Sequence, residues 1–168
     1  MGSEIKDILG KISSYNLFNY LFTGIVFVIV ASKVSRYSFI QQDVVLGLFL
    51  YYFIGLVVSR FGSLMVEPIL KGLSFVKFAD YEDFVAASKK DEKIDVLSEA
   101  NNTYRTLCAA FILLIFVKLY ENIEARLPAL KDWNAVVVLG LLAVIFLFSY
   151  RKQTQYVTKR VEINKVMP

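Results

Sequence analysis

Four long apolar stretches, separated by charged or amide-rich segments, dominate the order of hydrophobic and polar positions in this chain. The apolar runs are Leu17–Ala31, Val44–Val58, Leu107–Val117 and Ala135–Phe148. A membrane-spanning helix needs about 20 residues, and semi-polar flanks extend the four runs to residues 15–32, 43–63, 104–122 and 133–150. The pattern therefore predicts four membrane spans.

Composition distinguishes four membrane spans from the alternative, a soluble bundle of four buried helices. Of the 168 residues, 57% are hydrophobic, whereas an ordinary soluble domain is about 45–50% apolar. The chain also has no further set of helices with one polar face that could cover the four runs. We therefore predict an all-α integral membrane protein with four transmembrane helices and a short cytoplasmic helical insert between the second and the third.

The segments outside the four spans have patterns of their own. Residues 1–14 repeat apolar positions at helical spacing, which predicts an amphipathic helix lying on the membrane surface. These apolar positions are Ile5, Ile8, Leu9 and Ile12. Residues 64–103 form the predicted insert, in which Pro68 ends or kinks the second helix. Residues 151–168 form a basic tail.

Basic residues are distributed unevenly between alternate segments. Residues 1–16, residues 60–105 and the tail together carry 14 of the 19 Lys and Arg, and the two other connections carry five. Because basic residues are retained on the cytoplasmic side, we expect both termini and the insert to be cytoplasmic. The same asymmetry accounts for most of the net charge of +4, so no direct nucleic-acid partner is expected.

One helix is predicted to pass from the insert into the third span through Asn101 and Asn102. Neither Gly nor Pro occurs between Lys93 and Pro128, and the apolar spacing continues across the amide pair. The apolar stripe consists of Ile94, Leu97, Asn101, Tyr104 and then Leu107 or Cys108. On this pattern Asn101 hydrogen-bonds a neighbouring helix or subunit, with ordinary headgroup solvation of both amides as the alternative. Tyr104 and Arg105 anchor the helix at the membrane surface.

Polar side chains within or next to the predicted spans are costly in lipid and tend to face the protein interior. These residues are Asn16, Asn19, Thr23, Gly55, Ser59, Arg60, Ser63, Glu67 and Lys118. Gly55, Ser59 and Ser63 have the small-residue spacing that permits close helix contact, and Glu121 lies one turn from Lys118. We predict that the set lines a polar cavity or a subunit interface. The alternative is that Arg60 and Lys118 reach the two membrane surfaces.

The residues present give little support to enzymatic chemistry. The chain has no His and a single Cys, Cys108, which excludes His-dependent nucleophilic sites, His-ligated metal and a disulfide within the chain. The acidic residues of the insert alternate with Lys89, Lys90 and Lys93, which is typical of a solvated helix face rather than a metal site. We predict a protein that is not an enzyme and has no cofactor and no metal.

The amphipathic start, the stretch "YNLFNYLFTGIVF", the charged insert and "SEANNTYRTL" leading into the third span together resemble small bacterial four-span proteins. Those proteins are encoded beside phage-defence modules and include the membrane subunit of the Kiwa system and membrane accessory proteins of CRISPR loci. The resemblance covers the whole topology. It implies a non-enzymatic component of the bacterial inner membrane that forms oligomers, senses or perturbs the membrane, and has a cytosolic partner.

Three functions remain open on the sequence. The first is an oligomeric effector or anchor subunit of an anti-phage defence module, with a cytosolic protein docked at Asp91, Glu92 and Asp95. Its partners are then the lipid bilayer, further copies of the chain and that cytosolic protein. The second function is a small ion channel or transporter-like protein, and the third is a structural membrane protein of another pathway. Short spans and an insert too small for its own core favour a homo-oligomer of roughly three to eight copies.

Overall fold

Every regular element in the part of the chain that the structure describes is a helix. The computed structural model describes the backbone of residues 2–166 and the side chains of residues 15–165. Its elements are α1 (Gly2–Val34), α2 (Val44–Phe61), the π-helical turn η1 (Gly62–Val66), α3 (Glu67–Gly72), α4 (Tyr81–Ser88), α5 (Lys93–Arg126) and α6 (Leu130–Val166).

Four helices are long and apolar enough to cross a membrane. Their candidate spans are Tyr15–Val34, Val44–Gly72, Lys93–Arg126 and Leu130–Lys165. The second of these runs through α2, η1 and α3 without leaving helical conformation. The predicted fold class, an all-α protein with four helices of membrane-spanning length, is confirmed, and it identifies a multipass membrane protein.

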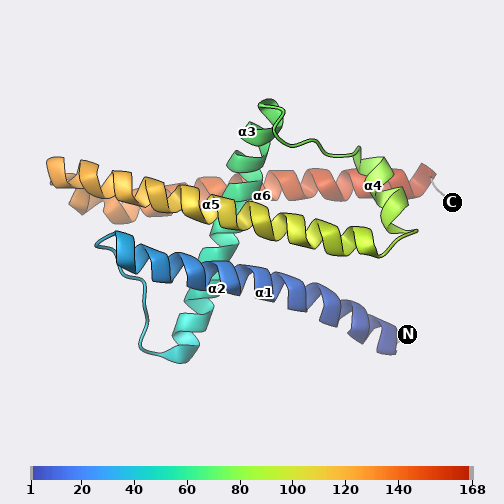
Figure 1. The fold of residues 1–168 in the computed structure, drawn as a ribbon, viewed down its shortest axis with the longest axis horizontal. Coiled ribbons are helices and arrows are strands. Elements are labelled where there is room, and N and C mark those ends of the chain that lie inside the picture. Colours follow the sequence, from blue (N-terminus) through green and yellow to red (C-terminus); the bar gives the residue numbers. More distant parts are fainter. Residues whose placement is uncertain (1, 167–168) are drawn as a thin grey trace.

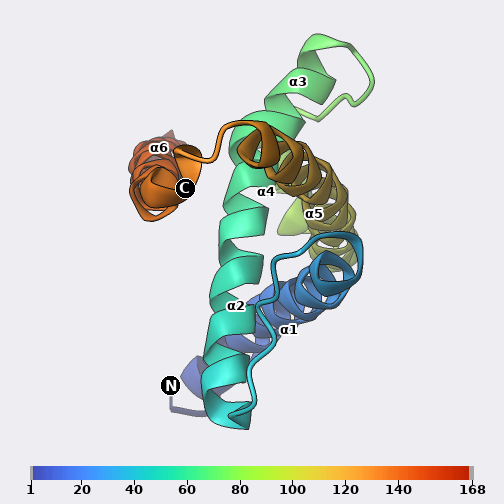
Figure 2. The same cartoon turned by 90° about the vertical axis from the view of Figure 1, so that its left-hand side faces the viewer.

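The four long helices do not form a parallel bundle. α1, α5 and α6 run along similar directions, whereas α2 runs across them (Figure 1). Figure 2 shows the same arrangement from one end, with α2 at full length and α5 and α6 foreshortened. α2 therefore meets each of the other long helices at a different level along its own axis.

The backbones of α1 and α2 approach each other closely at two glycines. A Cβ atom added to Gly24 would collide with the backbone carbonyl of Tyr51, and one added to Gly55 would collide with the carbonyl of Tyr20. Glycine is required at both positions because only a hydrogen atom fits between the two backbones. The predicted close helix contact at Gly55 is confirmed, and its counterpart on α1 is Gly24.

The apolar core lies where α1, α2 and α5 meet. Its buried members are Phe27, Val28, Ala31, Val58, Val66, Ala109, Ala110 and Leu114. Small residues on α5 again permit close approach, since a Cβ atom on Gly62 would lie 3.1 Å from the Cβ atom of Ala109. By contrast, no residue in the apolar window of α6 is buried inside the chain. The apolar surface of α6 is therefore available for contact with lipid or with another copy of the chain.

α5 runs unbroken from Lys93 to Arg126, so the predicted continuous helix through Asn101 and Asn102 is confirmed. The face that packs within the chain differs from the predicted stripe. Thr106 is buried there, whereas Asn101 and Tyr104 are exposed. The prediction that Asn101 contacts a neighbouring helix is therefore wrong within the chain, because apolar spacing alone cannot separate a face covered by protein from one covered by lipid. A contact between subunits stays a prediction.

Only residues 73–92 lie between the long helices that end at Gly72 and begin at Lys93. They contain the single short helix α4, of which Val85 is buried. At the other end of the chain, residues 2–14 continue α1 without a break. Their side chains, on which the predicted amphipathic face depends, lie outside the described residues.

Candidate functional site

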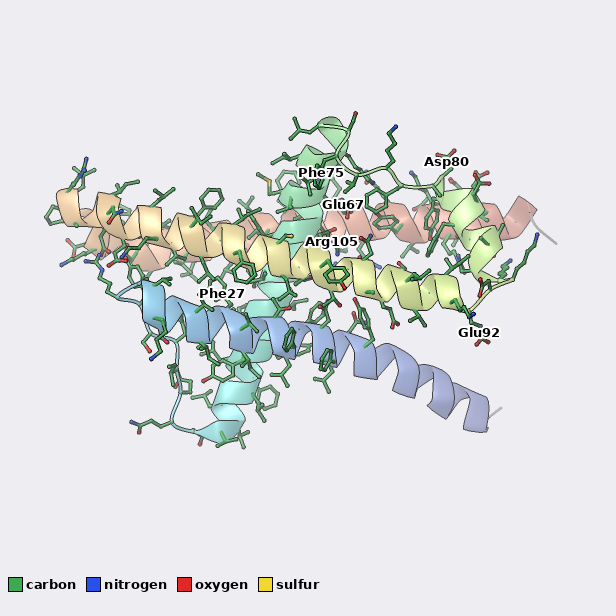
Figure 3. The ribbon with its side chains drawn as sticks, viewed as in Figure 1. Phe27, Glu67, Phe75, Asp80, Glu92 and Arg105 are labelled. Carbon is green, nitrogen blue, oxygen red and sulfur yellow. The ribbon has the colours of Figure 1, made fainter. Side chains whose placement is uncertain are left out.

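A carboxylate surrounded by three cations lies where α3, α5 and α6 come together. Glu67 accepts a hydrogen bond from Arg105 at 2.6 Å through its Oε2 atom. Its Oε1 atom lies 3.5 Å from the Nζ atoms of both Lys71 and Lys152. Figure 3 shows Glu67 and Arg105 side by side between α3 and α5. We call Glu67, Lys71, Arg105 and Lys152 the Glu67 cluster.

The π-helical turn η1 precedes Glu67 and has a local cause in Pro68. Proline has no N–H, and its ring collides with the carbonyl four residues earlier, so a regular α-helix cannot pass through it without adjustment. The turn widens here, and the Glu67 N–H donates to the carbonyl of Gly62, five residues back. The helix does not end at Pro68 but continues to Gly72. A π-helical turn of this kind often marks a functional position.

The three small residues predicted to permit close helix contact lie on α2 and η1, and each of them contacts a different helix. Gly55 lies against the α1 backbone, the Ser59 hydroxyl is 3.5 Å from that of Thr106 on α5, and Ser63 accepts two hydrogen bonds from Lys152 on α6. This division follows from α2 running across the other helices. Within the chain, Gly55, Ser59 and Ser63 therefore lie at three different helix interfaces. A polar cavity or subunit interface lined by the whole predicted set stays a prediction.

Buried polar side chains lie between α1 and its neighbours. Asn19 and Thr23 are 2% and 0% exposed, and neither Asn19 Oδ1 nor Thr23 Oγ1 has a hydrogen-bond partner among the described residues. Tyr15, on the same face of α1, donates to the carbonyl of Glu99 on α5 at 2.6 Å. Asn16 is half-buried. The predicted polar face of α1 is thus inside the protein, as its cost in lipid requires.

Arg60 and Lys118 each have a partner in the chain. The Arg60 guanidinium donates to the Tyr20 hydroxyl at 3.1 Å. Lys118 is exposed and pairs with Glu121 at 3.1 Å, as the spacing predicts. Lys118 does not join the Glu67 cluster, because it lies on α5 well beyond Arg105.

A second polar cluster, around Glu124, lies at the C-terminal end of α5 and was not predicted. The buried Glu124 carboxylate pairs with Arg36, accepts a hydrogen bond from the Tyr37 hydroxyl, and accepts another from Asn134 at 3.1 Å. Asn134 in turn accepts from Tyr120. The cluster ties the connection after α1 to the α5–α6 connection.

The predicted docking residues lie at the turn between α4 and α5. Asp91, Glu92 and Asp95 are all exposed. The Asp91 carboxylate accepts the backbone N–H of Lys93 at 3.0 Å, which stabilises the turn. Figure 3 shows Glu92 at the outer edge of the molecule, far from Phe27 in the core.

The sequence indicated Glu67 as a candidate site residue but did not indicate Glu124. Glu67 was predicted because it stands close to the end of a span, but its partner Lys152 reads as one of five basic residues in the tail. Glu124 reads as an ordinary residue of a polar connection. Neither pairing could be predicted, because both depend on contacts between helices far apart in the sequence.

The Glu67 cluster pairs charges carried by three helices, α3, α5 and α6. Among the described residues, no three His, Cys, Asp or Glu side chains are placed to hold a metal ion. Comparisons of the chain with family models, curated proteins and solved structures return no match. The function is therefore proposed from the geometry of the chain together with the sequence resemblance.

Proposed function

We propose that the protein is an oligomeric membrane effector or anchor subunit of a bacterial anti-phage defence module, and that it docks a cytosolic protein on the α4–α5 hairpin (residues 81–100). The observation that carries the docking role is the exposure of this hairpin. Val85 alone is buried in α4, while Asp91, Glu92 and Asp95 are exposed. The assignment to phage defence rests on the sequence resemblance.

Exposed apolar side chains accompany the acidic residues of the hairpin. Val96 and Leu97 in the first turns of α5 are 63% and 68% exposed. Acidic residues outnumber basic ones by six to three in residues 81–100, and exposed apolar groups beside net negative charge favour a protein partner of complementary charge. The partner surface that we expect is therefore basic, with an apolar centre.

The test is a combined charge reversal, Asp91→Lys, Glu92→Lys and Asp95→Lys, in cells that carry the chain with its neighbouring genes. We expect protection against phage, measured as plating efficiency, to be lost while membrane insertion stays unchanged. Asp132→Lys, in the first turn of α6, is the matched control and should protect like the wild type. Full protection by the triple variant would refute docking at the hairpin.

A small channel is the second candidate, and the buried polar face of α1 favours it. Asn19 Oδ1 and Thr23 Oγ1 are buried without a hydrogen-bond partner among the described residues, and such oxygens can replace the water around an ion. A channel predicts ion flux through vesicles that contain the purified protein alone. Thr23→Val should abolish that flux, whereas the triple charge reversal should not. Absence of flux in the wild type would reject this candidate.

A further inference from the structure

The Glu67 cluster carries more positive than negative charge. Three cations, Lys71, Arg105 and Lys152, face a single carboxylate. The side chains of Arg105 and Lys152 are only 21% and 25% exposed, so water neutralises their charge poorly. Half-buried charge without a counter-ion is unfavourable. An additional anion would therefore stabilise the cluster.

A small polar cavity lies beside the cluster and has room for one further oxygen atom. Its volume is about 20 Å³, close to the space that one water molecule needs. Its lining includes Arg60, Ser63, Ser149, Lys152, Gln153 and Tyr156. Gln153 and Tyr156 are exposed, so the cavity can be reached from the surface of α6.

Two buried polar atoms, one lining the cavity and one in the Glu67 cluster, lack hydrogen-bond partners among the described residues. The hydroxyl of Ser149 is buried and has no partner among the described residues, and the same holds for the Nε atom of Arg105. Buried polar atoms are normally hydrogen-bonded. Unpartnered groups next to excess positive charge are what a bound oxyanion would satisfy.

We propose that Arg60, Ser149 and Lys152, which line the cavity beside the Glu67 cluster, bind a phosphate group, with one phosphate oxygen in the cavity and the others at its mouth. Arginine and lysine are the usual partners of phosphate. An anionic lipid headgroup is the source that the surroundings favour. Leu147 and Phe148, one turn before Lys152, are exposed apolar side chains against which acyl chains can lie.

The experiment uses the full chain in mild detergent and measures bound lipid by native mass spectrometry. Phosphatidylglycerol is the anionic probe, phosphatidylcholine the zwitterionic one, and inorganic phosphate the soluble one. We expect phosphatidylglycerol to bind in preference to phosphatidylcholine. Arg60→Gln should weaken this binding roughly tenfold, the effect of losing one charge-assisted hydrogen bond.

Arg60 is the most informative position because it pairs with Tyr20 and is not one of the three cations that pair with Glu67 among the described residues. Lys152→Gln should weaken binding as well and Lys152→Arg should restore it, since the charge is kept. The matched control is Arg151→Gln, which removes the same charge one residue away on α6. It should bind like the wild type. Circular dichroism checks that each variant keeps its helix content.

The outcomes separate the sources of the phosphate. If phosphatidylglycerol binds preferentially and its binding needs Arg60, the result supports a lipid headgroup as the source of the phosphate. Binding of inorganic phosphate that needs Arg60 and displaces no lipid supports the site with a soluble source. Equal retention of both lipids without phosphate binding overturns the proposal. An equal effect of Arg60→Gln and Arg151→Gln also overturns it, because binding would then depend only on total charge.

Discussion

At the scale of single residues, Glu67 joins parts of the chain that are far apart in sequence. Its carboxylate contacts Arg105 on α5, Lys152 on α6 and Lys71 one turn along its own helix. Removing one charge from a buried ionic group destabilises a protein more than replacing the whole group by apolar residues, because the remaining charges stay buried without a partner. The contribution of Glu67 should therefore be large compared with that of exposed acidic residues.

Replacing this carboxylate by an amide tests that expectation. Glu67→Gln should lower stability by about 2–4 kcal/mol, measured by thermal unfolding in detergent. The matched control is Glu121→Gln, since Glu121 pairs with Lys118, whose side chain is 49% exposed. Exposed pairs contribute about 0–1 kcal/mol, so the control should unfold close to the wild type. Equal losses of stability for the two variants would show that Glu67 contributes no more to stability than Glu121.

At the scale of helices, the α1–α2 crossing depends on two glycines. Gly55→Leu should lower stability by about 1–3 kcal/mol or more, because the new side chain meets the α1 backbone rather than a movable side chain. Gly140→Leu is the matched control, since nothing lies within 4 Å of that position. The control should stay within about 0.5 kcal/mol of the wild type. Thermal unfolding and detergent size-exclusion profiles of the two variants give the comparison.

The helices themselves could be predicted from the sequence, but their packing faces could not. Apolar runs and the absence of Gly and Pro gave the four long helices and the unbroken α5. The stripe through Asn101 and Tyr104 is nevertheless exposed. In a membrane protein both lipid-facing and protein-facing sides are apolar, so periodicity does not tell them apart. Small residues such as Gly24 and Ala109 are the better signal of a packed face.

At the scale of the whole molecule, the segments expected on one side of the membrane lie at one end. The N-terminal end of α1, the helix α4 and the C-terminal end of α6 are together at one end of the molecule (Figure 1). The connection after α1 and the α5–α6 connection meet at the other end through the ion pair between Arg36 and Glu124. Of the four long helices, α1, α5 and α6 run between these two ends, whereas α2 runs across them (Figure 1).

Reporter fusions test the orientation of these two ends. Fusions after residues 12, 88 and 160 should all report cytoplasm, because 14 of the 19 basic residues lie in those segments and basic segments are retained there. A fusion at Arg126 should report the opposite side. A periplasmic signal from the fusion after residue 88 would contradict the four-span topology.

The exposed surface of α6 leads to a prediction about assembly. Its apolar side chains, among them Leu139, Leu141 and Leu147, are each more than half exposed, and copies of the chain could bury them against one another. We expect a homo-oligomer of roughly three to eight copies with cyclic symmetry. Native mass measurement in mild detergent gives the copy number. A uniform monomer would refute the expectation and leave α6 to lipid.

The π-helical turn before Glu67 has a consequence for how this chain could tolerate loss of a residue. A π turn holds one residue more than an α turn, so deleting one residue between Gly62 and Val66 could restore a regular helix at little cost to the backbone. The wider turn takes up its extra residue locally, so Glu67 would keep facing Arg105 after such a deletion. Deleting one residue from the regular part of α2 would instead rotate every later side chain on that helix by about 100°. That deletion would separate three parts of the chain that a single carboxylate joins.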